Sequence, residues 1–484
     1  MATITKSIKA SGGDYTTIAA WEADLDDTGI YASGDVAIGE CYNQVYNEAT
    51  VTINGGGTVG LASRKLSVAV GNRHNGTAGT GARFNNNGSI FLESTIANTI
   101  LEWLEVDGNE THIYTAEAIR MDNGAIISKI ILHGFYTYGF RGIYAWGNLD
   151  VFDSIIYNLK VSYGALRALD LICSQYYNVN IYNSTIHNLK NDSAYSDWVF
   201  GIRGVDYNTL RVKNLIVTDM GGTSLGTKLC YFPSSPVQAV MDYNLSSDAS
   251  AYGAHSLINK SSSNQYVSTV LGSEDLHLKA GADAINAGVD LGTTPVGVNI
   301  DIDGYDRDSN NVTWDMGADE VQTQTVTVDS VEGIVASEVI DVLRFVPGGA
   351  SDGLKLSETI SALSIIRVGT SDGLKLAETI SALATIQGGA SDGLKLSETI
   401  SAIALAVDIV TDGSNFSDSP EGVATALGSS VDVFVLGDLS AAIRTLLMGV
   451  YDRVEIVDQS PDPITGTIFV LMQGERPFLI ITAS

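Results

Sequence analysis

The chain has 484 residues, among them 50 glycines, with only 17% charged residues and a formal net charge of −29. Because its length exceeds that of one ordinary hydrophobic core, an elongated or multi-domain organisation is expected. The acidity excludes wrapping of nucleic acid, since a phosphate backbone needs a basic surface, and it disfavours docking on anionic lipid.

No uninterrupted apolar run is long enough to cross a bilayer, and residues 1–10 lack the apolar core of a secretory signal. We therefore expect no membrane insertion and no signal peptide. A chain built like an extracellular protein, yet without an export signal, is expected on a virion surface and outside the cell after lysis. Type I secretion is the alternative route.

Residues 1–45 are the first expected domain. Thr17 to Leu25 are predicted to form a short amphipathic helix with Thr17 as its N-cap and Trp21 within it. Residues 46–100 alternate apolar and polar side chains between clusters of glycine and asparagine, which predicts short strands.

Short apolar segments recur between residues 101 and 220, about 25 to 30 residues apart. One column consists of Val106, Ile131, Ile156, Ile186 and Ile216, and a second column between them of Ile119, Ile143, Leu169 and Ile202. Short strands at such a period indicate a solenoid or a propeller rather than a globular sandwich, because one unit cannot bury its apolar face alone and must stack on its neighbours. The alternative is an antiparallel β domain with asparagine-rich turns.

These repeats resemble the right-handed parallel β-helix of the pectate-lyase-like superfamily, which includes many phage tailspikes. Asn158 and Asn188 follow inward-facing isoleucines by two residues. They are expected to face inward at a left-handed turn and to bond from rung to rung, as in the asparagine ladder of that superfamily. Residues 12–22, Gly-Gly-Asp-Tyr followed by a helix with Trp21, are similar to the N-terminal cap of such proteins.

Residues 299–320 resemble the closing coil of many bacterial and phage β-helix proteins. They contain an Asp-x-Asp-Gly-x-x-Arg turn and a final Asp-x-Gly-Ala-x-Glu, although the usual proline after the arginine is absent. The resemblance therefore implies an all-β fold with a right-handed parallel β-helix over residues 46–320, capped by residues 1–45.

Residues 321–411 contain near-identical 20-residue copies that begin at Asp352, Asp372 and Asp392. Alternating apolar positions favour strands, although residues 357–363 also allow one helical turn. We expect a β-repeat stalk that packs against copies of itself in a homo-oligomer, with a trimer favoured. Residues 412–484 differ in composition. They are predicted to form a small α/β module for attachment or oligomerisation, with helices at 420–427 and 438–448.

Three groups of side chains are candidate sites, and the first is acidic. Asp301, Asp303 and Asp306 lie in one short segment and could offer carboxylate oxygens to Ca²⁺. Their order differs from that of an EF-hand, so a structural turn without any cofactor is the favoured interpretation.

The second group is an outward column of Arg120, Tyr144, Asp170 and Arg203. β-Helix polysaccharide lyases resemble it in using an Arg or Lys base beside acidic calcium ligands, and glycosidases on this fold use two or three carboxylates. Asp170, Arg203 and Arg120 are thus candidate catalytic residues. With one aspartate in the column, pairing of alternating charges on a solvated face is favoured.

The third group is aromatic. Tyr136, Tyr138, Tyr144 and Trp146 lie in one coil, and Trp198 lies two coils further on. Flat rings stack on sugar faces, so these residues predict carbohydrate binding. Packing inside the solenoid or against a neighbouring subunit is the alternative.

Together these features predict a phage-type virion structural protein, a spike, fibre or capsid decoration, that binds host-surface carbohydrate. Its expected partners are copies of itself, other virion proteins and a host glycan. A β-helix polysaccharide lyase or glycoside hydrolase is the first alternative, so catalysis stays open. A bacterial surface adhesin or filament protein is the second.

Overall fold

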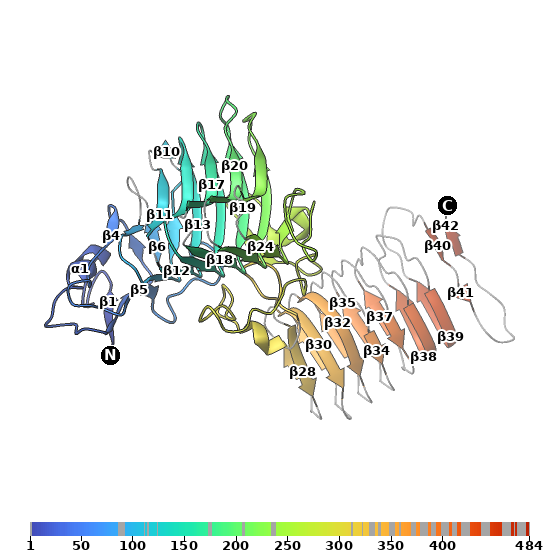
Figure 1. Cartoon of the computed structure of the whole chain (residues 1–484). Coiled ribbons are helices and arrows are strands. Elements are labelled where there is room, and N and C mark those ends of the chain that lie inside the picture. The colour runs from blue at the N-terminus through green and yellow to red at the C-terminus, as the bar shows by residue number, and fades with distance from the viewer. Residues whose placement is uncertain are drawn as a thin grey trace. The chain divides into compact units, whose positions relative to one another are not determined.

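The computed structural model describes residues 2–85, 92–110, 112–113, 116–122, 124–172, 177–205, 209–233, 239–310 and 313–321, and beyond these the backbone of strands between 323 and 483. The chain divides into two compact units, residues 1–320 and 321–484. Almost all of the regular structure is β, and the first unit is a parallel β-solenoid, or β-helix (Figure 1).

Three parallel sheets build the solenoid, and each coil between the first and the last contributes one strand to each sheet. Sheet A contains β1 (Thr3–Ile8), β2 (Val36–Cys41), β5 (Ser63–Val68), β8 (Thr99–Glu102), β12 (Ala125–Ser128), β15 (Leu149–Phe152), β18 (Asn178–Tyr182), β21 (Thr209–Lys213) and β24 (Ala239–Asp242). Sheet B contains β3 (Val45–Tyr46), β6 (Arg83–Asn85), β9 (Glu105–Asp107), β13 (Ile131–Thr137), β16 (Ile155–Val161), β19 (Thr185–Asn191), β22 (Ile216–Gly221) and β25 (Leu245–Ser246), with β10 (His112–Ile113) beside β13. Sheet C contains β4 (Val51–Ile53), β7 (Leu92–Ser94), β11 (Glu117–Met121), β14 (Phe140–Ala145), β17 (Leu166–Ile172), β20 (Val199–Val205) and β23 (Lys228–Pro233).

Helix α1 (Ile18–Ala23) lies near the first strands and confirms the predicted short helix (Figure 1). The Thr17 side chain accepts a hydrogen bond from the Ala20 N–H, as expected of an N-cap. Trp21 is fully buried, and a Cβ at Gly39 of β2 would lie only 2.7 Å from its ring. The helix thus seals apolar side chains at this end of the solenoid.

The inward columns largely agree with the predicted ones. Ile119, Ile143, Leu169 and Ile202 stand in one register through sheet C, as predicted. In sheet B, however, Val106 pairs with Leu132, and Ile186 pairs with Val217. The assignment of Ile131 and Ile216 to that column was therefore wrong by one residue.

The corner between sheets A and B repeats one backbone conformation in six successive coils. Left-handed residues occupy it: Trp103, Lys129, Asp153, Asn183, Asn214 and Tyr243, with φ between 42° and 64°. One such residue turns the chain sharply from one sheet into the next. Asn183 and Asn214 are fully buried, and the Asn214 side-chain amide donates to the Asn183 side-chain oxygen at 2.9 Å.

Residues 286–320, here called the strap, lie along this A–B corner and span several coils. The Asn214 amide donates to the carbonyl oxygen of Val289, and that of Asn183 to the carbonyl oxygen of Val298. Lys129 Nζ lies 3.0 Å from the carbonyl oxygen of Gly297. The strap, which includes the short 3₁₀ helix Arg307–Asn310, pairs with no strand of the three sheets within its described residues, so the expected closing coil is not formed there.

A buried ion network fastens the strap to the solenoid. Arg307 is fully buried, and its guanidinium lies 3.0 Å from both the Asp153 and the Glu320 carboxylates. Lys129 reaches the same Asp153 carboxylate at 3.4 Å. Because buried charges are stable only when paired and hydrogen-bonded, each member of this network holds the others in place.

Residues 247–285 connect the last coil with the strap. They contain the 3₁₀ helix Ser262–Asn264 and an antiparallel pair, β26 (Tyr266–Ser268) and β27 (Asp275–Leu278), beside the outer face of sheet B. Tyr266 contacts His187 of β19 edge-on, with ring centroids 5.3 Å apart.

The second unit is also built of parallel strands, with a spacing of 20 residues. Leu354 pairs with Leu374 and Leu374 with Leu394, so each copy of the repeat lies in register on the previous one. One row holds β28 (Thr323–Val328), β30 (Ile340–Pro347), β32 (Ile360–Val368), β34 (Ile386–Gly388), β36 (Ala406–Asp408), β38 (Ala426–Leu436) and β39 (Leu446–Ile456). A second row holds β29 (Ile334–Ala336), β31 (Leu354–Ser357), β33 (Leu374–Ala377), β35 (Leu394–Ser397) and β37 (Ser414–Ser417), and β40 (Gly466–Ile468), β41 (Val470–Leu471) and β42 (Ile481–Ala483) follow.

In the copy of the repeat that begins at Asp352, residues 354–357 and 360–368 are strands, as favoured over a helical turn. Of the two predicted tail helices, residues 420–425 and 438–445 lie outside the described residues. Their last residues are strand instead, in β38 and β39. Among the described residues, no helix combines the length and apolar character that a membrane span requires.

Candidate functional site

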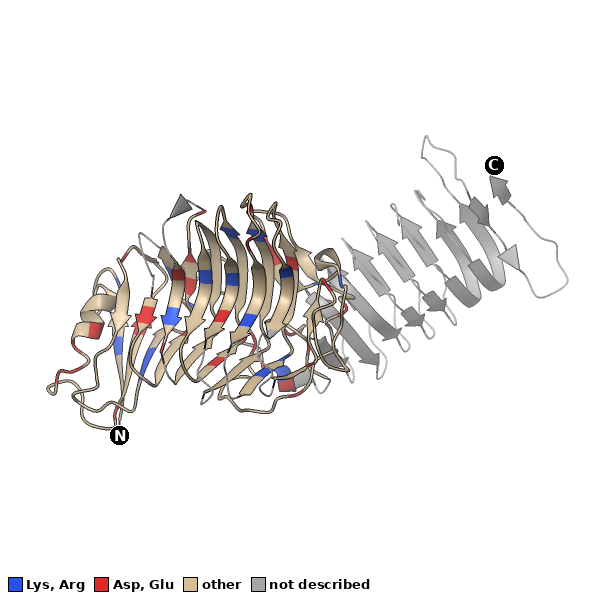
Figure 2. Ribbon diagram, turned by 45° about the horizontal axis from the view of Figure 1, so that its top comes forward, with Lys and Arg blue, Asp and Glu red and all other residues tan. Residues whose placement is uncertain are grey.

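The outer face of sheet C, here called the C face, carries the predicted outward column. Arg120, Tyr144, Asp170 and Arg203 stand in register on neighbouring strands. The column continues to Glu93 in one direction and to Phe232 in the other. Figure 2 shows such charged positions as blue and red segments on neighbouring strands.

A second column on the same face was missed. It consists of Glu117, Arg141, Arg167 and Phe200, three residues before the first column in each strand. Two adjacent residues between the columns, Ala168 and Leu169 in β17, are both buried, which breaks the alternation and turns both columns outward. A Cβ at Gly142 would lie 2.6 Å from the Ala168 carbonyl oxygen, so small residues are required at this kink.

Asp170 is the centre of the charges on the C face. Its carboxylate is fully buried and lies 2.7 Å from Arg141 Nε, 3.0 Å from Arg203 Nε and 3.6 Å from Arg167 Nη1. Arg141 also reaches Glu117 at 2.8 Å. Burial lowers the pKa of Arg167 to about 10. Asp170 raises this pKa by attraction, whereas Arg203 and Arg141 lower it further by repulsion.

Aromatic rings flank these charges on the C face. Trp146, directly after β14, is 54% exposed, and Trp198, directly before β20, is 49% exposed. Trp198 lies 6.0 Å from Phe200, which stacks on Phe232 at 4.5 Å. Tyr144 is buried instead, under the Arg141 guanidinium and with its hydroxyl accepting from Trp146 Nε1. It supports the surface rather than offering a free ring.

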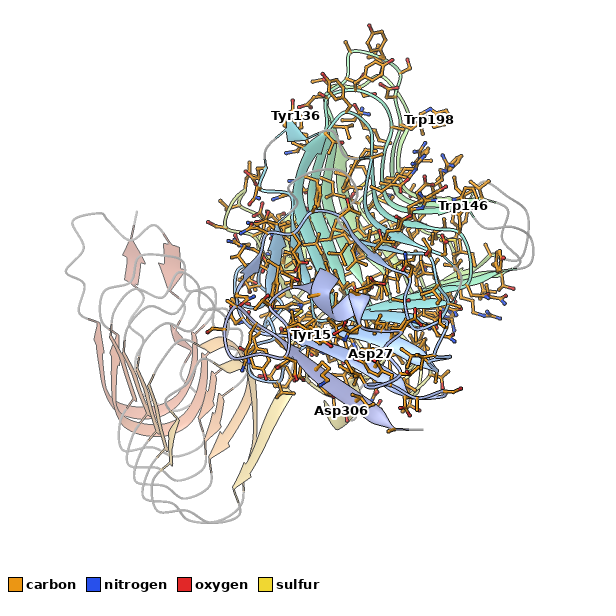
Figure 3. All side chains as sticks on the ribbon, turned by 90° about the vertical axis from the view of Figure 1, so that its left-hand side faces the viewer. Tyr15, Asp27, Tyr136, Trp146, Trp198 and Asp306 are labelled. Carbon is orange, nitrogen blue, oxygen red and sulfur yellow. The ribbon has the colours of Figure 1, made fainter. Side chains whose placement is uncertain are left out.

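The other two predicted carbohydrate-binding residues lie elsewhere. Tyr136 is on the outer face of sheet B, and Figure 3 shows it on the side of the solenoid opposite Trp146 and Trp198. Tyr138 is exposed at the corner between sheets B and C. Tyr163 and Tyr195, also exposed, have ring centroids 5.4 Å apart. The sequence signal for Tyr163 is the Tyr-Gly pair that recurs at 138–139 and 163–164.

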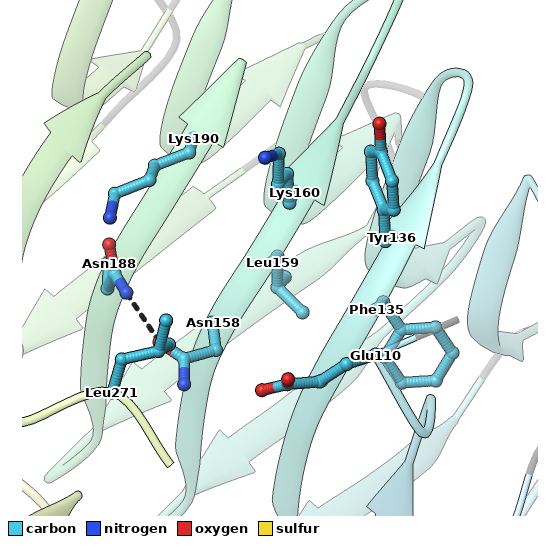
Figure 4. Close-up of a pocket in the computed structure, with 10 residues that line it drawn as sticks. Glu110, Phe135, Tyr136, Asn158, Leu159, Lys160, Asn188, Lys190 and Leu271 are labelled. Carbon is cyan, nitrogen blue, oxygen red and sulfur yellow. Dashed lines mark hydrogen bonds between the residues drawn. The ribbon is translucent and has the colours of Figure 1, made fainter. Parts of the chain in front are cut away.

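Tyr136 lines a groove of about 270 Å³ on sheet B (Figure 4). Lys160, Lys190, Glu110 and the two predicted ladder residues line it as well. Asn158 and Asn188 have φ of 51° and 55°, and the Asn188 amide donates to the Asn158 side-chain oxygen, which confirms the left-handed turn and the rung-to-rung bond. Their expected inward orientation is wrong, because both are half-buried at the surface and Asn158 also bonds Glu274.

The acidic segment does not gather its carboxylates in one place. Asp301 is buried, and its oxygens accept from the backbone N–H groups of Asp303, Tyr305 and Glu320, as in a tight turn. Burial and the neighbouring Asp319 charge raise the pKa of Asp301. Asp306 accepts from the Asn299 amide at the surface.

Asp303 instead belongs to a cluster with His277 and Asp319, whose potential ligand atoms lie within 4.8 Å of one another. His277 contacts Asp275 through Nδ1 and Asp303 through Nε2 at 3.1 Å. Burial alone would lower the pKa of His277, but its two carboxylate partners raise it to about 12. Both imidazole nitrogens thus lie against carboxylates, and these residues form an ion-paired cluster.

A second group with metal-ligand chemistry is formed by Glu105, Asp107 and His133 on sheet B. His133 Nε2 lies 3.0 Å from Glu105, and Arg83 lies 3.6 Å from Asp107. Tyr157 stacks on the His133 ring with centroids 5.1 Å apart. The three residues come from adjacent strands, β9 and β13, and the nearby Arg83 charge opposes a cation there.

A comparison with models of known protein families gives no match to this chain, and a search of curated proteins gives none either. The chemistry of the C face and the sheet B groove is therefore what indicates possible ligands.

Proposed function

We propose that this protein is a virion structural protein of the phage type that binds host-surface glycan through the C face. The observation that carries the proposal is the pair of half-exposed indoles, Trp146 and Trp198, on one face with a dense row of ion-paired side chains. Large aromatic surfaces left exposed beside fixed polar groups are typical of binding sites. A sugar ring offers apolar C–H faces to such rings and hydroxyls to such charges.

The virion role is supported by the architecture of the chain. A solenoid can present one long side surface, and regular 20-residue coils can extend a protein by whole units. We propose that residues 321–484 join copies of the chain into a trimer and connect them with other virion proteins. Light scattering of the full chain and of residues 1–320 tests this role. A trimer that becomes a monomer on truncation is expected, and a monomer in both cases would contradict it.

Glycan binding is tested with an array of bacterial surface polysaccharides. Trp146→Ala and Trp198→Ala should each weaken binding at least tenfold with little change in thermal stability. Tyr252→Ala and Tyr305→Ala are matched controls, because both rings are 54% exposed but lie outside the C face. Equal losses in all four variants, or a collapse of stability in the tryptophan variants, would contradict the proposed site.

The enzyme alternative has one specific observation in its favour, the carboxylates of Asp170 and Glu117 on the C face. Both are held by Arg141, at 2.7 and 2.8 Å. Because both carboxylates are engaged in these ion pairs, the geometry favours binding over acid–base catalysis. Release of reducing ends from a bound polysaccharide, lost in Glu117→Gln, would establish catalysis and replace the binding proposal.

A further inference from the structure

The two columns of the C face hold more arginine than carboxylate side chains, in a chain whose net charge is −29. Arg120 lies 3.5 Å from Glu93, and Arg141 lies 2.8 Å from Glu117. Arg167 and Arg203 then have only Asp170, which Arg141 shares. In these two columns four guanidinium groups thus face three carboxylates, so Arg167 and Arg203 share one carboxylate with Arg141.

The two arginines that share Asp170 with Arg141 are also poorly solvated. The side chains of Arg167 and Arg203 are 11% and 17% exposed. Within the part of the chain that the structure describes, Arg167 Nε has no hydrogen-bond acceptor although it is buried. Burying a cation without full pairing costs free energy, so an arrangement of this kind is expected where an anion completes it.

The neighbours of these arginines match the proposed sugar site. Phe200 stands beside Arg167 in the strand register, and Trp198 lies next to Phe200. A sugar ring on Trp198 would bring an acidic substituent toward the two guanidinium groups. The planar guanidinium fork binds carboxylate, sulfate and phosphate oxygens in pairs, which an ammonium group cannot do.

The groove on sheet B is less suited to an anion. Its Lys160 is paired with Asp192 at 2.7 Å, and Glu110 contributes a negative charge to the same lining. Lys190 lines the same groove as Glu110, so the groove carries both signs of charge.

We propose that Arg167 and Arg203 bind an oxyanion substituent of the glycan, so that the ligand of the C face is an acidic polysaccharide. This inference rests on the proposed glycan binding at Trp146 and Trp198. Carboxylate, sulfate and phosphate share the required chemistry, and the test distinguishes them.

The first experiment uses the full chain and simple anions, at constant ionic strength. Calorimetric titrations with sodium sulfate, phosphate and glucuronate are compared for the unmodified protein, Arg167→Gln and Arg211→Gln. Arg211 is an exposed arginine of β21 and controls for the loss of one charge. Binding of at least one anion is expected, weakened about ten- to hundredfold by R167Q and unchanged by R211Q. No binding, or equal weakening by both variants, would overturn the proposal.

The second experiment repeats the polysaccharide array with R167Q and Arg167→Lys. Bound glycans should be acidic, R167Q should lose them, and R167K should regain part of the binding because it keeps the charge. Neutral glycans bound equally by R167Q would overturn the acidic ligand while leaving the tryptophan site intact. No glycan bound by any form would instead count against the proposed function. Thermal unfolding of both variants verifies that they fold.

Discussion

The side-chain amide of Asn214 donates to the side-chain oxygen of Asn183, one coil earlier, and neither side chain reaches solvent. The same Asn214 amide bonds the Val289 carbonyl oxygen, and its side-chain oxygen accepts from the Val289 N–H. One residue thus joins two coils and the strap, and it does so from a left-handed conformation with φ of 55°.

Asn214→Ala should therefore lower the free energy of unfolding by about 2–4 kcal/mol, from a buried N–H left unpaired and from strain at positive φ. Urea unfolding measures the effect. Asn259→Ala is the matched control, because Asn259 has φ of 56° but is exposed, and its loss should stay near 1 kcal/mol. Equal losses would mean that backbone strain alone accounts for the effect.

Asp170→Asn should lower the free energy of unfolding by about 3–5 kcal/mol, because it leaves three buried or half-buried arginines without their shared carboxylate. The control is Asp192→Asn, which breaks the more exposed pair with Lys160 and should cost less than about 1 kcal/mol. A loss for Asp170→Asn as small as that of the control would show that the arginines are solvated and not dependent on Asp170.

The stability of the first unit should fall as the pH rises above neutrality. His277 keeps its proton in the folded state up to a pKa of about 12, whereas the unfolded chain releases it near its ordinary value of 6.5. The stabilisation is complete below 6.5 and is lost between the two values, at up to about 1.4 kcal/mol per pH unit.

The check is the free energy of unfolding of the unmodified protein and of His277→Gln between pH 6 and 9. The slope should be much smaller in H277Q, since glutamine carries no titrating proton. Parallel curves would mean that other groups cause the decline, such as Asp301, Asp319 and Glu320, whose pKa values are raised by burial.

Deleting residues 372–391 should leave a folded protein, because β35 would then pair with β31 through an identical Leu-Lys-Leu-Ser strand. Solubility and melting temperature should stay close to those of the full chain. Deleting only 372–381 is the control, since half a period destroys the register and should give insoluble protein. Loss of soluble protein on the 20-residue deletion would refute the in-register repeat.

The sequence predicted the coil spacing and one inward column, because Ile119, Ile143, Leu169 and Ile202 have polar or small neighbours. It misplaced Ile131 and Ile216, since both residues of the pairs Ile131-Leu132 and Ile216-Val217 are buried. The strap explains this for Ile216, whose side chain would lie 2.8 Å from a Cβ at Gly317. Where a distant segment covers the outer face of a strand, the outward side chains are apolar as well. The alternation of apolar and polar residues, which normally shows which side chains point inward, is then lost.

The spacing of the coils also predicted the first charged column of the C face, but it did not predict the second column. Arg141 and Arg167 precede the first column by three residues, which regular alternation would put on the opposite face. The kink at Gly142 and Ala168 reverses this expectation. Likewise, the partners of Asp303 are His277 and Asp319. These residues are distant in the sequence and lie beside Asp303 only once the strap is folded.

The strap also determines how the first unit would respond to force. Hydrogen bonds between coils run along the solenoid axis, so tension along that axis would load them one after another and peel coils from an end. The bonds of Asn214, Asn183, Lys129 and Asp153 with the strap bridge four successive coils. These links share the load with the coil-to-coil hydrogen bonds. They should therefore raise the rupture force of the central coils above that of the outer ones.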